Sequence, residues 1–275
     1  MILLKMSIKN NYEAMQEALS ILLELERLPV GIKFIKTKEE YEAVKAKEPK
    51  SGLPYCTAVA KASNSGESYK LDIAHNRCAA ASTALGMLPV SEYRLSGQMH
   101  ADLKVYKDLE VSRGVAHDMV YCQEKNFGVL VQPLGLYEKE KPDVVILIST
   151  PKWAMRLLQG YAYNFGQLKN IKMAGMCAIC QECTSYPFVK KQPNVSMLCA
   201  GTRCVGQWKE HELGIGIPAD ILRELIDGIW HTIDPMEPKK VKEKLMTRLQ
   251  EAGLAVPDID LNNNYYSHAY GIPKK

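Results

Sequence analysis

Apolar and polar residues alternate along this chain with two different periods, which predict helices and strands in mixed order. Three-and-four spacing of apolar residues, typical of amphipathic helices, occurs over residues 12–26, 37–44, 109–119, 151–161, 218–229 and 238–252. Shorter apolar runs predict strands at 30–35, 69–73, 101–106, 128–134 and 144–148. We therefore expect an α/β (mixed α+β) fold in which helices flank a mixed sheet.

Capping residues support several of these elements. Asn11 is placed to cap the first helix, and Thr37 with Glu40 forms a capping box before the second. Cys78 opens an Ala-rich helix that ends at Gly86. The segment 213–218 alternates Gly with apolar residues, which favours a strand that another segment approaches closely.

The length predicts one compact domain over residues 1–275, with enough apolar sequence (47%) for a sizeable core. The order of strands and cysteines also suggests two similar halves, 28–135 and 136–232, followed by a C-terminal helix and tail at 233–275. In each half a strand precedes two cysteines, separated by 22 residues in the first half and 19 in the second. Such halves would each contribute two cysteines to a shared site.

Charge and hydropathy exclude two classes of partner. The net charge is +4 without long runs of one sign, which does not favour nucleic-acid binding. Apolar runs stay far below the roughly 20 residues that a membrane-spanning helix needs, and the first residues turn polar at Lys5 without a signal-peptide pattern. We expect a cytoplasmic protein.

Eight cysteines in a reducing compartment indicate metal or redox chemistry more often than disulfides. The densest group is Cys177, Cys180 and Cys183 at Cys-x2-Cys-x2-Cys spacing, with Cys199 and Cys204 downstream. Iron–sulfur clusters commonly take thiolates from such a run and from one remote cysteine. The run lacks the ferredoxin cysteine that precedes a proline, so its spacing favours a metal without specifying which one.

Three other interpretations of the cysteines remain open. A four-cysteine zinc site would usually pair two Cys-x2-Cys knuckles, and Cys199 with Cys204 makes a poor second one. Cys177 and Cys180 could form a redox pair without metal. Isolated cysteines are often core residues, and we expect this of Cys122.

Three polar residues beside the cysteines are candidates for supporting chemistry. His75 precedes Cys78 by three residues and could ligate metal or donate a proton. Glu182 lies inside the cysteine run, where a carboxyl group could supply a proton. Arg203 follows Cys199, and its charge would stabilise a reduced, negatively charged cluster.

Several motifs together resemble one family. They are Leu28-Pro-Val-Gly-Ile-Lys-Phe, Cys56 with Ala60, His75-x2-Cys78 before Leu85-Gly86, Asp143-Val-Val with Ala154-Met155, and Asn194-Val-Ser-x2-Cys199-x-Gly201-x-Arg203 before Glu212 and Ile217-Pro218. In this order, over about 15–232, they resemble the DUF169 family, an uncharacterised and often cysteine-rich family of archaea and anaerobic bacteria. The resemblance implies no established activity.

The resemblance does rank the cysteines. It implies that Cys56, Cys78, Cys180 and Cys199 are the shared set, with Glu182 two residues after the third. Cys177, Cys183 and Cys204 are then extras of a narrower subgroup. Either Cys177 or Cys183 could replace Cys180, or the chain could hold a second cluster.

We therefore expect one [4Fe–4S] cluster, or two if the extra cysteines also bind. The expected function is redox chemistry or electron transfer, with a redox partner or as a reductase of a small molecule. The sequence does not decide between enzyme and carrier. The alternative is a zinc-stabilised cysteine-rich binding protein without catalysis.

Overall fold

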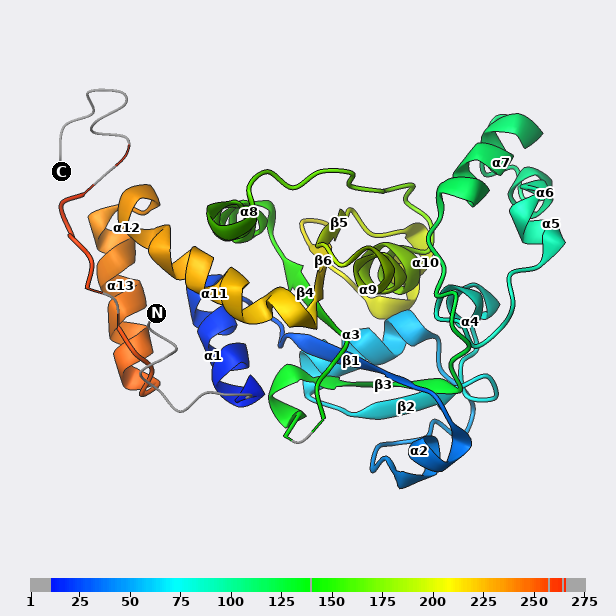
Figure 1. Cartoon of the computed structure of the whole chain (residues 1–275), viewed down its shortest axis with the longest axis horizontal. Helices are drawn as coiled ribbons and strands as arrows, with labels where there is room; N and C mark the ends of the chain where they lie inside the picture. The colour runs from blue at the N-terminus through cyan, green and yellow to red at the C-terminus, as the bar shows by residue number, and fades with distance from the viewer. Residues whose placement is uncertain (1–10, 139, 257, 264, 266–275) are drawn as a thin grey trace.

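A six-stranded sheet runs through the centre of the protein (Figure 1). The computed structural model describes residues 11–138, 140–256, 258–263 and 265. The strands are β1 (Val30–Ile35), β2 (Tyr69–Asp72), β3 (Gly128–Pro133), β4 (Val144–Ser149), β5 (Asn194–Ser196) and β6 (Leu213–Pro218). The fold class expected from the sequence is confirmed, although these strands pair antiparallel throughout where a mixed sheet was expected.

The strand order is β2-β3-β1-β4-β6-β5. β1 and β4 form the central antiparallel pair, with Val30 opposite Ile146 and Ile32 opposite Val144. Exchanging β1, β2 and β3 for β4, β5 and β6 reproduces the same order from the other edge. The strands of residues 28–135 and 136–232 thus occupy equivalent places on the two sides of the central pair.

One face of the sheet is covered by α1 (Tyr12–Leu22), α8 (Pro151–Phe165) and α11 (Leu222–His231), and α13 (Lys239–Glu251) extends the core by packing on α1. Val145 and Leu147 of β4 and Ile215 and Ile217 of β6 point into this core. α8 and α11 pack closely, because Gly160 and Gly228 leave no side chain between them. A Cβ atom at Gly228 would lie 2.0 Å from the Gly160 carbonyl oxygen.

The opposite face is covered by α3 (Tyr55–Ser65), α4 (Ala79–Ala84), the π-helix η2 (Ala178–Ser185) and α9 (Tyr186–Lys190). Cys180 and Cys183 belong to the core on this face, and Cys56 and Cys78 pack against it. Val144, Ile146 and Ile148 of β4 point into this second core. Both faces of β4 are therefore buried, which explains its uninterrupted apolar sequence.

The remaining helices are α2 (Lys38–Ala43), α5 (Glu92–Leu95), α6 (Gln98–Asp102), α7 (Leu109–Asp118), α10 (Ala200–Gly206), α12 (Ile233–Met236) and the 3₁₀ turns η1 (Leu134–Leu136) and η3 (Ala219–Ile221). Figure 1 shows α5, α6 and α7 grouped at one end of the molecule and α12 and α13 at the other. Within the described residues, no helix combines the length and apolar character needed to cross a bilayer.

Most predicted elements are confirmed within a few residues. Asn11 accepts a hydrogen bond from the Ala14 amide, and the Thr37–Glu40 capping box forms. The strand predicted over 101–106 is wrong. That segment is the end of α6 and the turn after it, and its apolar residues Leu103 and Val105 are exposed instead of facing a core. Parts of the predicted irregular tail, at 257, 264 and 266–275, lie outside the described residues.

Candidate cysteine-rich site

Four cysteines converge on the face of the sheet that carries α3 and the π-helix. Cys56 lies in the first turn of α3, Cys78 is the N-cap of α4, Cys180 belongs to the π-helix, and Cys199 is the N-cap of α10. α3 contacts both α10 and the π-helix, and α4 also contacts the π-helix. Residues 143 positions apart in the sequence are thereby brought into one region.

The pKa values of these thiols show how near they lie to one another. Burial, and then the thiolate charges of Cys78 and Cys199, raise the pKa of Cys56 to about 11. The hydrogen bond with Cys177 and burial raise the pKa of Cys180 well above its usual value, and the charges of Cys78 and Cys56 add to this. Cys56 is therefore within electrostatic reach of Cys78, Cys180 and Cys199. We call Cys56, Cys78, Cys180 and Cys199 the four-cysteine group.

The group lies just below the surface. Cys56, Cys78 and Cys199 are half-buried, Cys180 is buried, and all eight cysteines of the chain are free thiols. The sulfur of Cys199 accepts a hydrogen bond from the Thr202 amide at 3.4 Å and lies 3.1 Å from the Thr202 hydroxyl oxygen. Such donors stabilise negative charge on a cysteine sulfur.

The π-helix separates the three cysteines of the Cys-x2-Cys-x2-Cys run. Its hydrogen bonds span five residues instead of four, which widens the turn. Cys180 faces the four-cysteine group, whereas Cys183 packs on β6, where a Cβ atom at Gly214 would lie 2.9 Å from its sulfur. Cys177 precedes the π-helix with a left-handed backbone (φ 53°) and forms a hydrogen-bonded pair with Cys180. The run therefore does not converge on one point.

The other cysteines lie in different surroundings. Cys183 is fully buried, and burial raises its pKa. The charge of Cys199 contributes in the same direction. Cys204 is exposed on α10. Cys122 is buried beside Ser185, and burial raises its pKa to about 11. Its surroundings fit the core position expected from the sequence.

Glu182 is a buried carboxyl group, 1% exposed, next to this site. It accepts hydrogen bonds from the Ala174 amide, at 2.7 Å, and from the Ser196 hydroxyl. Burial raises its pKa even though these donors act in the opposite direction. The neutral, protonated form is thus favoured more than in an exposed carboxyl group, which suits a proton donor.

His75 and Arg203 use their hydrogen bonds away from the cysteines. Nδ1 of His75 lies 2.7 Å from the Asp72 carboxylate and 3.4 Å from the Tyr41 hydroxyl. Arg203 donates to the carbonyl oxygens of Lys209, Met197 and Glu212, and so fixes the turn between α10 and β6. Their proposed roles at a cofactor stay predictions, and the structure gives both residues a structural role.

The four-cysteine group fits an iron–sulfur cluster in its donor chemistry, because the donors are free thiols that repel one another as thiolates. Among the described residues, no three His, Cys, Asp or Glu side chains are grouped closely enough to hold one metal ion. Four thiolates on one zinc would all lie about 2.3 Å from it. In a cubane cluster each thiolate binds a different iron atom, so its ligands are spaced more widely.

Arg94, His100 and Tyr106 are not among the residues predicted for the site; Arg94 and His100 are buried, Tyr106 is half-buried, and the charge of Arg94 acts on the Cys177 thiol. They come from two short helices and a turn, where no periodicity or motif marks them. A charged residue in the apolar surroundings of a core is visible only after the fold is known.

The fold and the four-cysteine group define a cysteine-rich α/β protein built on an antiparallel sheet. The profile of the DUF169 family, described as "Uncharacterised ArCR", matches residues 18–228, and the chain belongs to this family. An uncharacterised protein of Methanocaldococcus jannaschii is 22% identical over 215 residues, which cover 76% of this chain and 90% of that protein. No solved structure matches the chain.

Proposed function

We propose that Cys56, Cys78, Cys180 and Cys199 bind a [4Fe–4S] cluster and that the protein acts in redox chemistry or electron transfer. The observation that carries this proposal is the mutual charge interaction of these thiols, which come from four separate elements. Neighbouring thiols disfavour one another's ionisation, and bound iron would compensate the charge of the thiolates. The cluster would supply one-electron transfer.

The chain's own residues would set the properties of such a site. The Thr202 amide would keep its hydrogen bond to the Cys199 sulfur, and such bonds shift the reduction potential of a cluster. The half-buried position would allow electron exchange with a redox partner at the surface. Glu182 would hold a proton beside the site, which a reductase of a small molecule needs and a simple carrier does not.

The raised pKa values imply that metal loading releases protons. At neutral pH Cys56 and Cys180 are protonated in the metal-free protein, because burial and the neighbouring thiols raise their pKa. Thiolates are the metal-binding form, so loading should become weaker as the pH falls. Eight free thiols also favour a reducing compartment, and we propose a cytoplasmic location.

Cysteine-to-serine variants test the proposed ligands. Cys56→Ser and Cys199→Ser should each lose most of the bound iron and sulfide, because a cubane cluster needs a ligand at each iron. Cys122→Ser is the matched control, since Cys122 is equally a free thiol but lies in the core. The measurement is the iron, sulfide and zinc content of each protein after anaerobic purification.

Equal metal contents in all three variants and in the wild-type protein would contradict the assignment of Cys56 and Cys199 as ligands. Stoichiometric zinc without iron, lost in Cys56→Ser and Cys199→Ser alone, would instead support a zinc-stabilised binding protein at the same four residues. Either result would contradict the iron–sulfur proposal.

A further inference from the structure

A second group of polar side chains, in the α5–α7 group of helices, has buried polar atoms. It consists of Arg94 on α5, His100 on α6 and Tyr106 in the turn before α7; we call these three the Arg94 cluster. Arg94 is 8% exposed and His100 is 0% exposed. The rings of His100 and Tyr106 meet edge to face, with centroids 5.6 Å apart.

The polar atoms of this cluster lack partners. Nη1 of Arg94, both ring nitrogens of His100 and the hydroxyl oxygen of Tyr106 are buried without a hydrogen bond to any described residue. No ion pair joins Arg94 to a carboxylate within the described part of the chain. Each unsatisfied buried donor costs about 1–3 kcal/mol, and more when it is charged. Buried groups without partners in a folded protein therefore point to a missing ligand.

The cluster is next to the cysteine-rich site. The charge of Arg94 acts on the thiol of Cys177, on His100 and on Tyr121. Burial raises the pKa of Tyr106, and the charges of Cys177 and Glu182 raise it further. Arg94, which also forms a hydrogen bond with Tyr121, and Tyr106 thus both lie near Cys177, which is hydrogen-bonded to Cys180.

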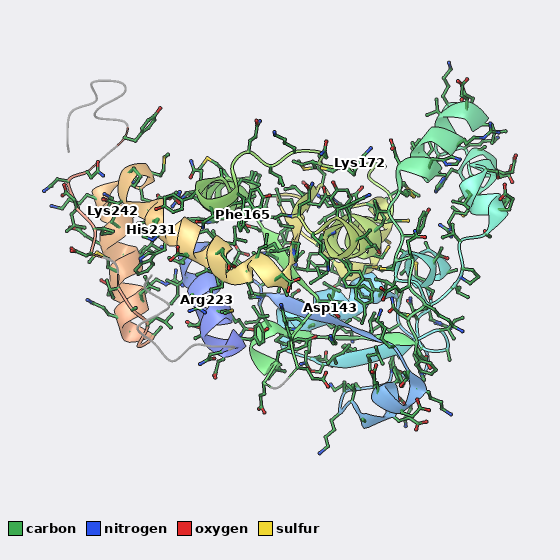
Figure 2. All side chains as sticks on the ribbon, viewed as in Figure 1. Asp143, Phe165, Lys172, Arg223, His231 and Lys242 are labelled. Atoms are coloured by element: carbon green, nitrogen blue, oxygen red, sulfur yellow. The ribbon has the colours of Figure 1, made fainter. Side chains whose placement is uncertain are left out.

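A small cavity lies between α7 and the π-helix. Its volume is about 100 Å³, and Met119, Ala174 and Gln181 are among its lining residues. Nε2 of Gln181 is a further buried donor without a partner among the described residues. Lys172, labelled in Figure 2, lies at the rim and pairs with Asp118 of α7 at 2.9 Å. Of the unpartnered donors, Gln181 lines this cavity, so a small polar molecule has room at that donor.

We propose that the Arg94 cluster binds a small oxyanion, a carboxylate or a phosphate, next to Cys177. A guanidinium group is always charged and is shaped to bind such groups. An imidazole N–H and a phenol hydroxyl beside it add neutral donors, so that the three unpartnered groups together suit an acceptor with several oxygen atoms. Arg94 also interacts with the Tyr121 hydroxyl and with the Cys177 thiol, whose pKa its charge lowers, so an anion at Nη1 would be bound beside these two groups.

The role of this anion as the substrate of a cluster-dependent reaction rests on the proposed function, but its binding does not. The position beside Cys177 would place a bound acid close to the cluster and to the proton of Glu182. A reductase of a small acid or of a phosphorylated compound would need such an arrangement. An electron carrier would not.

Binding of two probes, acetate and inorganic phosphate, to the full-length protein as purified tests the inference by isothermal titration calorimetry. We expect saturable binding of one of them, and which probe binds distinguishes a carboxylate site from a phosphate site. Arg94→Gln should weaken binding at least tenfold, because it removes a charged hydrogen bond. Tyr106→Phe, which deletes only the hydroxyl group, should weaken it several-fold and keep the fold intact.

Matched controls are Arg113→Gln and Tyr93→Phe, which change exposed residues of the same group of helices. Neither should alter the affinity. Absence of saturable binding for both probes would overturn the inference, as would equal affinity in the wild-type protein and in Tyr106→Phe. The iron content is measured on the same samples, so anion binding without iron would contradict the proposed function alone.

Discussion

Glu182 is a buried residue whose packing changes the pKa of its carboxyl group. Its carboxyl group receives two hydrogen bonds, from Ala174 and Ser196, yet burial still raises its pKa. Thr184 and Ser185 follow it in the π-helix and are buried too, with hydroxyl groups bonded to carbonyl oxygens within the same helix. Glu182 thus lies among hydrogen-bonded polar groups, and its carboxyl group favours the protonated form.

The raised pKa of Glu182 has a consequence for stability. Because the folded state favours the protonated form, the contribution of Glu182 is fully present below the ordinary pKa of 4.5 and is lost as the pH rises through the raised value. Glu182→Gln removes this titration. The free energy of unfolding of the variant, relative to wild type, should therefore increase between pH 5 and pH 8.

Urea unfolding at several pH values measures this difference. Glu210→Gln, at an exposed position, is the control and should follow the wild-type profile. If the relative stability of Glu182→Gln stayed constant over that range, or fell, the buried carboxyl group would not be the acid that we describe.

At the scale of elements, the π-helix depends on the two glycines of β6. A Cβ atom at Gly216 would lie 2.1 Å from the carbonyl oxygen of Cys183, and one at Gly214 would lie 2.9 Å from the Cys183 sulfur. The alternation of Gly with Ile in β6 leaves one face free for the π-helix, while Ile215 and Ile217 fill the other core. This contact positions Cys180 toward α3 and α4.

Gly216→Ala should therefore destabilise the protein by about 3 kcal/mol, because backbone atoms of the π-helix must move to make room. Gly114→Ala, within α7, is the matched control. No atom lies within 4 Å of its added Cβ, and the change should stabilise the protein by about 0.5–1 kcal/mol. Denaturant unfolding of both variants measures the difference, and equal stabilities would contradict the packing described here.

The sequence predicts those elements that have a local pattern: β4 has an apolar run, α2 has a capping box, and β6 alternates Gly with apolar residues. The end of α6 and the turn after it, which replace the strand expected over 101–106, could not be predicted. Their conformation depends on the tight packing of Gly97 against Arg113, with a left-handed backbone at Gly97 (φ 81°). The separation of Cys180 from Cys183 was equally hidden, because it results from the π-helix and from β6.

For the whole molecule, the order of the strands relates the two halves of the chain. Cys56 lies between β1 and β2, and Cys180 lies between the equivalent strands β4 and β5. Cys78 and Cys199 both occupy N-cap positions, one between β2 and β3 and the other between β5 and β6. Each half thus has two cysteines at corresponding places between its strands. This correspondence is what a site shared by the two halves would require.

Iron and sulfide analysis of the anaerobically purified wild-type protein, with a visible spectrum before and after dithionite, tests the iron–sulfur proposal most directly. The account predicts about four irons and four sulfides per chain and a broad absorption that bleaches on reduction. About eight of each would add a second cluster on the remaining cysteines. A colourless protein without iron, whether it holds zinc or no metal, would contradict the proposal.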